Sequence, residues 1–273
     1  MKRAIAIALS LALLALAAGC SGKGKTVNSP DDFEGARIAV QDETTADESI
    51  TEMKDAGKNI TITRYPQVIN CFDDLRAGRV DAVYVDSVVA AYYTTGSGEY
   101  SRVWLSDEAE PLGICLKKGS DNLLAAIEAA VDTLYYNGKM GDIARKHFGD
   151  DPTASLRTVT SAPVIPPVSE AELRTPGVLS IGADVGYPPM EYYADDGTTM
   201  VGFDIDVGEA IAELLGLKAE VIDTAWDGIF AGVERGDYDC IISSVSITPA
   251  RQAVYLLTEP YVANALCVVV KKK

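Results

Sequence analysis

Strand and helix signals alternate along this chain on both sides of a proline-rich stretch. Short apolar runs such as "ARIAVQ" (36–41) and "VDAVYVD" (80–86) predict buried strands, and apolar residues at helical spacing follow them. After residues 150–176, which are rich in Pro, Thr, Ser and Ala, the alternation resumes. This order predicts an α/β fold with mostly parallel sheets, in which ligands bind beyond the carboxyl ends of the strands.

A sequence pattern that occurs twice in the chain favours two similar units that face each other across a cleft. The segments "DDLRAGRVDAVYVDS" (73–87) and "AGVERGDYDCIISSV" (231–245) share a helix, a glycine, an aspartate and an apolar strand with a polar end. A length of 273 residues, 48% of them hydrophobic, is enough for two compact units. The alternative is coincidence, because a helix, a glycine and a strand in succession are common in α/β proteins.

Charge and residue counts exclude several functions. Lys plus Arg is 24 and Asp plus Glu is 40, so the net charge of −16 argues against a nucleic-acid partner. The single histidine, His147, rules out a histidine-based zinc cluster and leaves a Ser-His-Asp triad unsupported. We predict no metal and no cofactor. Four scattered cysteines are expected to be buried free thiols rather than disulfides: Cys71, Cys115, Cys240 and Cys267.

The N-terminus is typical of an export signal. Positive charge at residues 1–3 precedes an apolar stretch, and "LAAGCS" follows it. This stretch resembles the lipobox of bacterial lipoproteins. We therefore predict a signal peptide over 1–19, a lipid on Cys20 and a polar tether over 20–29. The protein is then extracytoplasmic, held by that lipid on the outer face of the cell membrane, or periplasmic. Ordinary cleavage that leaves a free soluble protein is the alternative.

The segment "IISSVSITPAR" (241–251) starts as a buried strand and becomes polar. Two apolar residues lead into hydroxyls, and Arg251 follows Pro249, which prevents the strand from continuing. Buried hydroxyls need partners and an unpaired buried charge is costly, so a packed core does not favour this ending. It indicates a site for a small ionised molecule.

Several segments in order resemble the extracellular solute-binding proteins of ABC importers, in the branch that binds polar amino acids. "GADVGYPPMEYY", "VGFDIDVGEAIAELLG" and "WDGIFAGVERGDYDCIISSVSITPARQ" look like the first lobe of that family. "DDFEGARIAVQDETTADE", "LRAGRVDAVYVD" and "GICLKKGSDNLLAAIEAAVDTLYYNGKMGDIARKHFG" look like its second lobe and closing helices. The resemblance implies a periplasmic-binding-protein type II fold, monomeric, with two lobes joined by two hinge crossovers. It also implies a free amino acid as ligand, and an ABC permease with its ATPase as partners.

The two halves stand in the reverse of the family's usual order, as in a circular permutation. On that interpretation lobe 2 is 30–110 plus 265–273, and lobe 1 is 111–264. Residues 150–176 then join the family's usual termini. A piece of a longer tandem array is the alternative. The permuted order requires residues 266–271 to join the sheet that contains Arg37 to Gln41.

An amino acid zwitterion needs one group for its carboxylate and another for its ammonium. Arg251 offers a planar fork that fits the carboxylate. Thr44 and Thr45, at a predicted helix start, add hydroxyl and N–H donors. Asp86, at the end of its strand, is the counter-charge for the ammonium. The resemblance assigns the same roles to these positions, with two further acceptors in Ser244 and Ser246.

Aromatic and acidic residues describe the rest of the predicted site. Tyr187 and Trp226 match the family's aromatic walls, and Asp184 lies where the ligand's side chain ends, near Ser243. A carboxylate beside aromatic rings favours a cationic side chain. We expect arginine, lysine, ornithine or histidine, with glutamine next, and no catalytic residue.

Other interpretations stay open for these residues. Arg251 could be a surface ion-pair partner, Asp86 a helix cap and Asp184 a loop-holding residue, while Tyr187 and Trp226 could be core aromatics.

Two other functional classes also stay open. One is a dehydratase of prephenate-like acids on the same fold, with Glu43 or Glu191 as general acid. The other is a ligand-sensing subunit of a signalling system. Glu43 also departs from the family, which often has glycine at that position.

Overall fold

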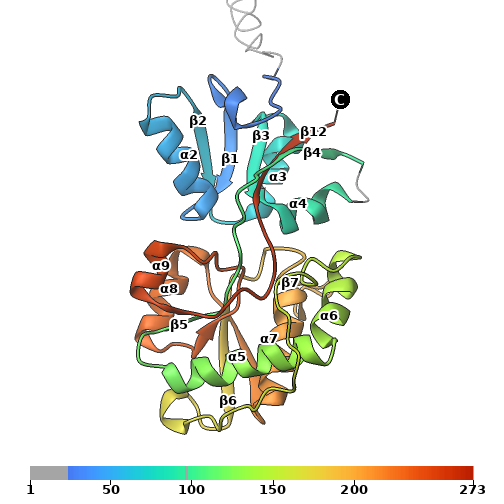
Figure 1. Cartoon of the computed structure of the whole chain (residues 1–273). Coiled ribbons are helices and arrows are strands. Elements are labelled where there is room, and N and C mark those ends of the chain that lie inside the picture. The colour runs from blue at the N-terminus through green and yellow to red at the C-terminus, as the bar shows by residue number, and fades with distance from the viewer. Residues whose placement is uncertain (1–23, 96–97, 273) are drawn as a thin grey trace, which may run out of the picture.

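Two five-stranded sheets form the framework of the protein, and each is the centre of one lobe (Figure 1). The computed structural model describes residues 24–95 and 98–272. One sheet has the order β2-β1-β3-β12-β4, from β1 (Arg37–Gln41), β2 (Thr61–Tyr65), β3 (Ala82–Asp86), β4 (Tyr100–Leu105) and β12 (Leu266–Lys271). Its helices are η2 (Pro30–Phe33), α2 (Thr45–Asp55), α3 (Val68–Ala77) and α4 (Ser87–Thr94). We call this half lobe 2.

The second sheet and its helices form the half that we call lobe 1. Its order is β11-β5-β10-β6-β9, from β5 (Cys115–Leu116), β6 (Val178–Ala183), β9 (Lys218–Asp223), β10 (Cys240–Ile241) and β11 (Leu256–Leu257). A small sheet pairs β7 (Tyr192–Tyr193) with β8 (Met200–Val201). The helices are α5 (Asp121–Tyr136), α6 (Lys139–Phe148), η3 (Glu170–Glu172), α7 (Phe203–Leu214), α8 (Trp226–Arg235) and α9 (Pro249–Val254).

The alternation of side chains along β1 shows why this strand lies in the middle of a covered sheet. Ile38 and Val40 belong to the same hydrophobic cluster as Ile50 of α2. Ala39, between them, belongs to the cluster that contains Phe72 of α3. Because successive side chains of a strand point to opposite faces, β1 needs apolar residues at all three of its central positions.

The two occurrences of the repeated sequence pattern have the same local structure. The glycines that end α3 and α8 both adopt the left-handed conformation, with φ of 72° and 78°. The aspartates that follow each accept a backbone hydrogen bond from a neighbouring strand. Asp81 accepts from Arg37 at 2.9 Å, and Asp239 accepts from Ser180 at 2.7 Å.

Two crossovers join the lobes and run side by side (Figure 1). One leads from β4 to β5 and the other from β11 to β12. They are hydrogen-bonded to each other where Tyr261 N–H donates to the Leu112 carbonyl at 3.0 Å and Glu110 N–H donates to the Asn264 carbonyl at 2.8 Å. The prediction of a two-lobe α/β fold with two hinge crossovers is confirmed.

Strand β12 occupies the place that the permuted order requires. It lies between β3 and β4 and is antiparallel to both. Its residues Cys267 and Val269 are fully buried. The sheets are therefore mixed, which corrects the expectation of mostly parallel sheets. The reason is that each crossover enters the other lobe at the edge where the parallel strands end. The strand that follows the crossover therefore runs in the opposite direction, because no helix first carries the chain back across the sheet.

Arg157 holds the start of the proline-rich stretch against lobe 1. Only 9% of the Arg157 side chain is exposed. Its guanidinium donates to Glu128 at 2.9 Å and Asp132 at 2.7 Å, both on α5. It also donates to the backbone carbonyls of Glu259 at 2.5 Å and Pro260 at 2.8 Å, where the second crossover begins. The stretch therefore packs as part of the fold.

We expect Arg157→Ala to lower the free energy of unfolding by about 2–4 kcal/mol, because it leaves two carboxylates and two carbonyls without their donor. Urea denaturation measures the change. The matched control is Arg145→Ala. Arg145 is 53% exposed and pairs with Asp142 at 2.6 Å on the surface, so its loss should cost less than about 1 kcal/mol. Equal effects of the two substitutions would contradict the prediction.

The state of the cysteines, the search for membrane-crossing helices and the N-terminal signal are separate from the two-lobe fold. The four cysteines of the described residues are free and buried, which confirms the expectation of free thiols. Over 24–95 and 98–272, no helix has the length and apolar character that a membrane crossing requires. The signal peptide and the lipid on Cys20 lie outside the described residues.

Candidate ligand-binding site

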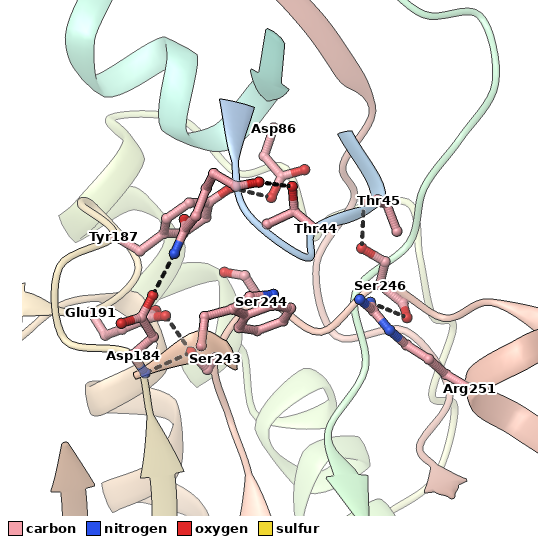
Figure 2. A pocket seen from close by; sticks show the side chains of 12 residues that line it. Thr44, Thr45, Asp86, Asp184, Tyr187, Glu191, Ser243, Ser244, Ser246 and Arg251 are labelled. Atoms are coloured by element: carbon pink, nitrogen blue, oxygen red, sulfur yellow. Dashed lines mark hydrogen bonds between the residues drawn. The ribbon is translucent and has the colours of Figure 1, made fainter. Parts of the chain in front are cut away.

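A pocket between the two lobes is lined by side chains from both of them (Figure 2). The structure brings all ten predicted ligand-binding residues together around it, with two residues that we did not predict. The full lining is Gln41, Thr44, Thr45, Asp86, Asp184, Tyr187, Glu191, Trp226, Ser243, Ser244, Ser246 and Arg251. That these residues bind a ligand stays a prediction.

The strands deliver these residues because their carboxyl ends meet at the cleft. Gln41 and Asp86 are the last residues of β1 and β3, and Asp184 directly follows β6. Ser243 follows β10 by two residues. This is the edge at which α/β sheets bind ligands.

Helix α2 points its N-terminus at the pocket. Thr44 is the N-cap, and its hydroxyl accepts from the Asp47 N–H at 3.3 Å and donates to the Gln41 carbonyl at 2.8 Å. The hydroxyl of Thr44 is therefore used within the loop, and the helix N-terminus is what remains for an anion. Thr45 lies across from Ser246 of the other lobe, with 3.5 Å between their hydroxyl oxygens.

Arg251 brings a positive charge that has no ion-pair partner among the described residues. Its Nη1 donates to the Ser246 carbonyl at 3.1 Å, and its guanidinium carbon lies 5.6 Å from the Trp226 ring centre and 5.0 Å from that of Phe230. Burial lowers the pKa of Arg251 below its ordinary value. A guanidinium without a carboxylate partner is suited to an anionic ligand group.

Asp86 brings a buried carboxylate to the other side of the pocket. It is 8% exposed and accepts from the Tyr187 hydroxyl at 2.6 Å and from Asn264 Nδ2 at 2.6 Å. Burial, aided by repulsion from Glu110, raises the pKa of Asp86 to about 7. It stands at the N-cap position of α4 but makes no capping hydrogen bond. The helix-cap interpretation therefore does not account for its side chain.

A second acidic group lies at the lobe 1 end of the pocket. Asp184 accepts from Gln41 Nε2 at 2.7 Å, and burial raises its pKa to about 6. Its backbone N–H donates to Ser243 Oγ at 3.0 Å, and that hydroxyl donates to Glu191 Oε1 at 2.6 Å. The side chain of Asp184 holds a residue of the other lobe and not its own loop.

The two predicted aromatic residues line the pocket and also pack in the hydrophobic core. Tyr187 and Trp226 are each 8% exposed, belong to hydrophobic clusters and line the pocket. Trp226 Nε1 donates to the Glu43 carbonyl across the lobes at 3.0 Å. Glu43, which stands where the resemblance favours glycine, adopts a left-handed φ of 58°. The glycine-like backbone is therefore kept despite the side chain, at a cost of about 1–2 kcal/mol.

The predicted ligand-binding residues did not include Gln41 and Glu191, and Glu191 was named only as a general acid for the alternative dehydratase. Gln41 could have been found, because a polar residue that ends a buried strand in an α/β sheet lies at the ligand edge. Glu191 had a weaker signal. It follows "GYPPM" in a loop, and only the fold of that loop brings it next to Ser243.

The raised pKa values predict how stability depends on pH. A carboxyl whose pKa is raised by folding contributes stability that is lost as the pH rises through the folded value. The pKa values of Asp86, Asp184 and Asp204 are raised to about 7, 6 and 6. We therefore expect the free energy of unfolding to fall between about pH 4.5 and 7, measured by urea titrations. A rise over that interval would contradict these assignments.

The described residues contain no group of three or more His, Cys, Asp or Glu side chains that could hold a metal ion.

Comparisons with known proteins find a match in the C-terminal third of the chain. Residues 179–273 match the family model of bacterial extracellular solute-binding proteins, family 3. The match begins within β6 (Val178–Ala183), where the predicted permuted order places the start of the family's sequence.

Curated relatives match over a similar share. The L-cystine-binding protein TcyJ of Escherichia coli (strain K12) is 32% identical over 96 residues, 35% of this chain and 36% of that protein. The L-cystine-binding protein TcyA of Bacillus subtilis (strain 168) is 32% identical over 102 residues, 37% and 38% of the two chains. The ABC transporter arginine-binding protein 1 of E. coli (strain K12) is 31% identical over 94 residues, 34% and 38%. The match thus spans little more than a third of these relatives.

A solved structure gives a comparably partial match. The arginine-bound form of truncated ArgBP from T. maritima is 34% identical, over 28% of this chain and 36% of that chain, with a TM-score of 0.27.

Proposed function

We propose that this protein is the substrate-binding component of an amino acid ABC importer and binds a polar, side-chain-cationic L-amino acid between its lobes. One observation carries the proposal. A guanidinium without an ion-pair partner, Arg251 of lobe 1, and a buried carboxylate, Asp86 of lobe 2, line the same pocket. Opposite charges on opposite lobes fit the two poles of a zwitterion.

The carboxylate of the ligand takes the Arg251 side of the pocket. The guanidinium supplies a planar pair of donors, and the N-terminus of α2 adds backbone N–H groups beside Thr45. Both donors already point into the pocket, so binding of an anion loses little conformational entropy in ordering them.

The ammonium of the ligand takes the Asp86 side. The Asp86 carboxylate and the Ser244 and Ser246 oxygens offer acceptors from both lobes. A cation between them favours the ionised form of Asp86, whose pKa is raised by burial and by repulsion from Glu110.

The side chain of the ligand points toward Asp184 and Glu191. Two carboxyl groups at that end favour a cationic nitrogen over a neutral or acidic group. Relatives of this chain are named for the binding of cystine, arginine and octopine, and each of these ligands carries a cationic nitrogen in addition to its α-nitrogen.

Binding then favours the state in which both lobes contact the ligand, and the closed form is the one presented to a permease and its ATPase. The protein acts as a monomer, tethered through a lipid on Cys20. We do not propose catalysis. A prephenate-type acid carries more than one carboxylate, and among the twelve lining residues only Arg251 is a cation.

A thermal-shift screen with the twenty amino acids, ornithine and cystine tests the proposal. A ligand that binds only the native state raises the melting temperature. We expect a shift of several degrees with at least one of arginine, lysine, ornithine and cystine. No shift with any compound, or turnover of prephenate, would contradict the proposed function.

A further inference from the structure

Two buried side-chain oxygens at this pocket receive no hydrogen bond from a donor among the described residues. They are Glu191 Oε2 and Ser244 Oγ, and their residues are 1% and 6% exposed. Both residues line the pocket. Buried polar atoms without partners are uncommon and costly, by about 1–3 kcal/mol each, so their coincidence at one cavity calls for an explanation.

The network around Glu191 fixes which of its oxygens is available. Oε1 accepts the Ser243 hydroxyl at 2.6 Å, and that hydroxyl is itself held by the Asp184 N–H at 3.0 Å. This chain of bonds orients the carboxyl group and leaves Oε2 without a donor, and the protonated Glu191 carboxyl donates to Asp204. Figure 2 shows Glu191, Asp184 and Ser243 together at one end of the pocket.

Acidic groups and hydroxyls surround Glu191. Asp184 follows β6, and Asp204 on α7 accepts from the Tyr261 hydroxyl and the Ser244 N–H, each at 2.8 Å. The remaining facing groups are the hydroxyls of Ser243, Tyr187 and Tyr261. Within the described residues, no cation compensates this cluster. Burial and the Asp204 charge hold the pKa of Glu191 well above its ordinary value.

We propose that Glu191 is a specificity-determining ligand contact, whose Oε2 accepts a hydrogen bond from a cationic nitrogen at the end of the ligand's side chain. The inference rests on the proposed function, because it requires an amino acid with its α-groups at Arg251 and Asp86. It specifies which oxygen of Glu191 binds that nitrogen and couples the binding to the loss of a proton.

A proton must leave when such a ligand arrives. In the empty pocket Glu191 holds its proton, since burial and neighbouring carboxylates oppose ionisation. A cationic nitrogen at Oε2 reverses that balance, so Glu191 loses its proton to solvent and becomes the carboxylate that pairs with the ligand. Binding of a cationic ligand therefore releases a proton from Glu191, and its affinity increases with pH wherever Glu191 is protonated in the free protein. A neutral isostere leaves the proton in place.

Isothermal titration calorimetry tests this at pH 7 in two buffers of different ionisation enthalpy. The probes are L-arginine, L-lysine, L-ornithine and L-cystine, with L-citrulline as the neutral counterpart of arginine. We expect more proton release with the cationic ligand that binds best than with citrulline, because the ammonium of either compound displaces the proton that Asp86 partly holds at pH 7. Glu191→Gln should weaken the cationic ligand by about 10- to 100-fold and remove the difference in proton release. Glu209→Gln, an exposed change on α7, is the matched control and should alter neither.

The outcomes separate this inference from the proposed function. Binding of a cationic amino acid with no more proton release than citrulline causes, or with unchanged affinity in Glu191→Gln, overturns the role of Glu191 and leaves the proposed function standing. A preference for citrulline does the same. Failure of every amino acid to bind overturns both. The buffer comparison uses the unaltered protein, so the test holds even if the variant does not fold.

Discussion

Arg251→Ala is expected to abolish amino acid binding. The guanidinium is the only cation among the lining residues and faces the pocket without an ion-pair partner. Its removal leaves the carboxylate of the ligand buried and unpaired, which costs about 3–5 kcal/mol, or roughly a 100- to 5,000-fold loss of affinity. Calorimetry with the ligand that gives the largest thermal shift measures the loss.

The stability of the same variant is the control. Arg251 makes one hydrogen bond, to the Ser246 carbonyl, and contacts two aromatic rings, so its loss should change the free energy of unfolding by no more than about 1–2 kcal/mol. Arg251→Lys keeps the positive charge but loses the planar pair of N–H donors. Its affinity should lie between those of the unaltered protein and Arg251→Ala. Unchanged binding in Arg251→Ala would remove this residue from the site.

Asp86→Asn is expected to change affinity and stability in opposite directions. The ammonium of the ligand loses its counter-charge, so affinity should fall by about 100-fold. The free protein should become more stable above pH 7, on the order of 2 kcal/mol, because burial raises the pKa of Asp86 to about 7 and the ionised form is unfavourable there. Below pH 4 the gain should disappear.

Asp81→Asn is the matched control for this prediction. Asp81 is also an aspartate of lobe 2, but its carboxylate accepts from Arg37 and from backbone N–H groups, and these bonds lower its pKa. Its substitution should therefore reduce stability and leave affinity unchanged. A loss of stability in Asp86→Asn at pH 8 would show that Asp86 is a structural carboxylate.

Local patterns were enough to predict most of the fold. Apolar runs at the strands, helical spacing and the glycines after α3 and α8 are encoded within a few residues, and the structure follows them. Sheet direction was predicted less well. The antiparallel placement of β12 depends on the two crossovers, and no local pattern records how a distant strand enters a sheet.

Some residues of the candidate site could likewise be predicted from local sequence, and others could not. Asp86 and Arg251 were predictable because each ends or follows a strand at the ligand edge. Glu191 depends on a loop geometry that only long-range contacts create. Likewise, Arg157 lies in a stretch that composition marks as a linker, yet it is buried against α5 and the second crossover. Composition predicts how a segment behaves alone and not what it packs against.

The central claim is that the ligand's carboxylate and ammonium are bound at the same time by Arg251 and Asp86. Calorimetry of the unaltered protein with its best amino acid, and with the amine that lacks only the α-carboxylate, tests it most directly. The account predicts that the amine binds at least about 100-fold more weakly, because the Arg251 charge then has no partner. Equal affinity for the two compounds would contradict it.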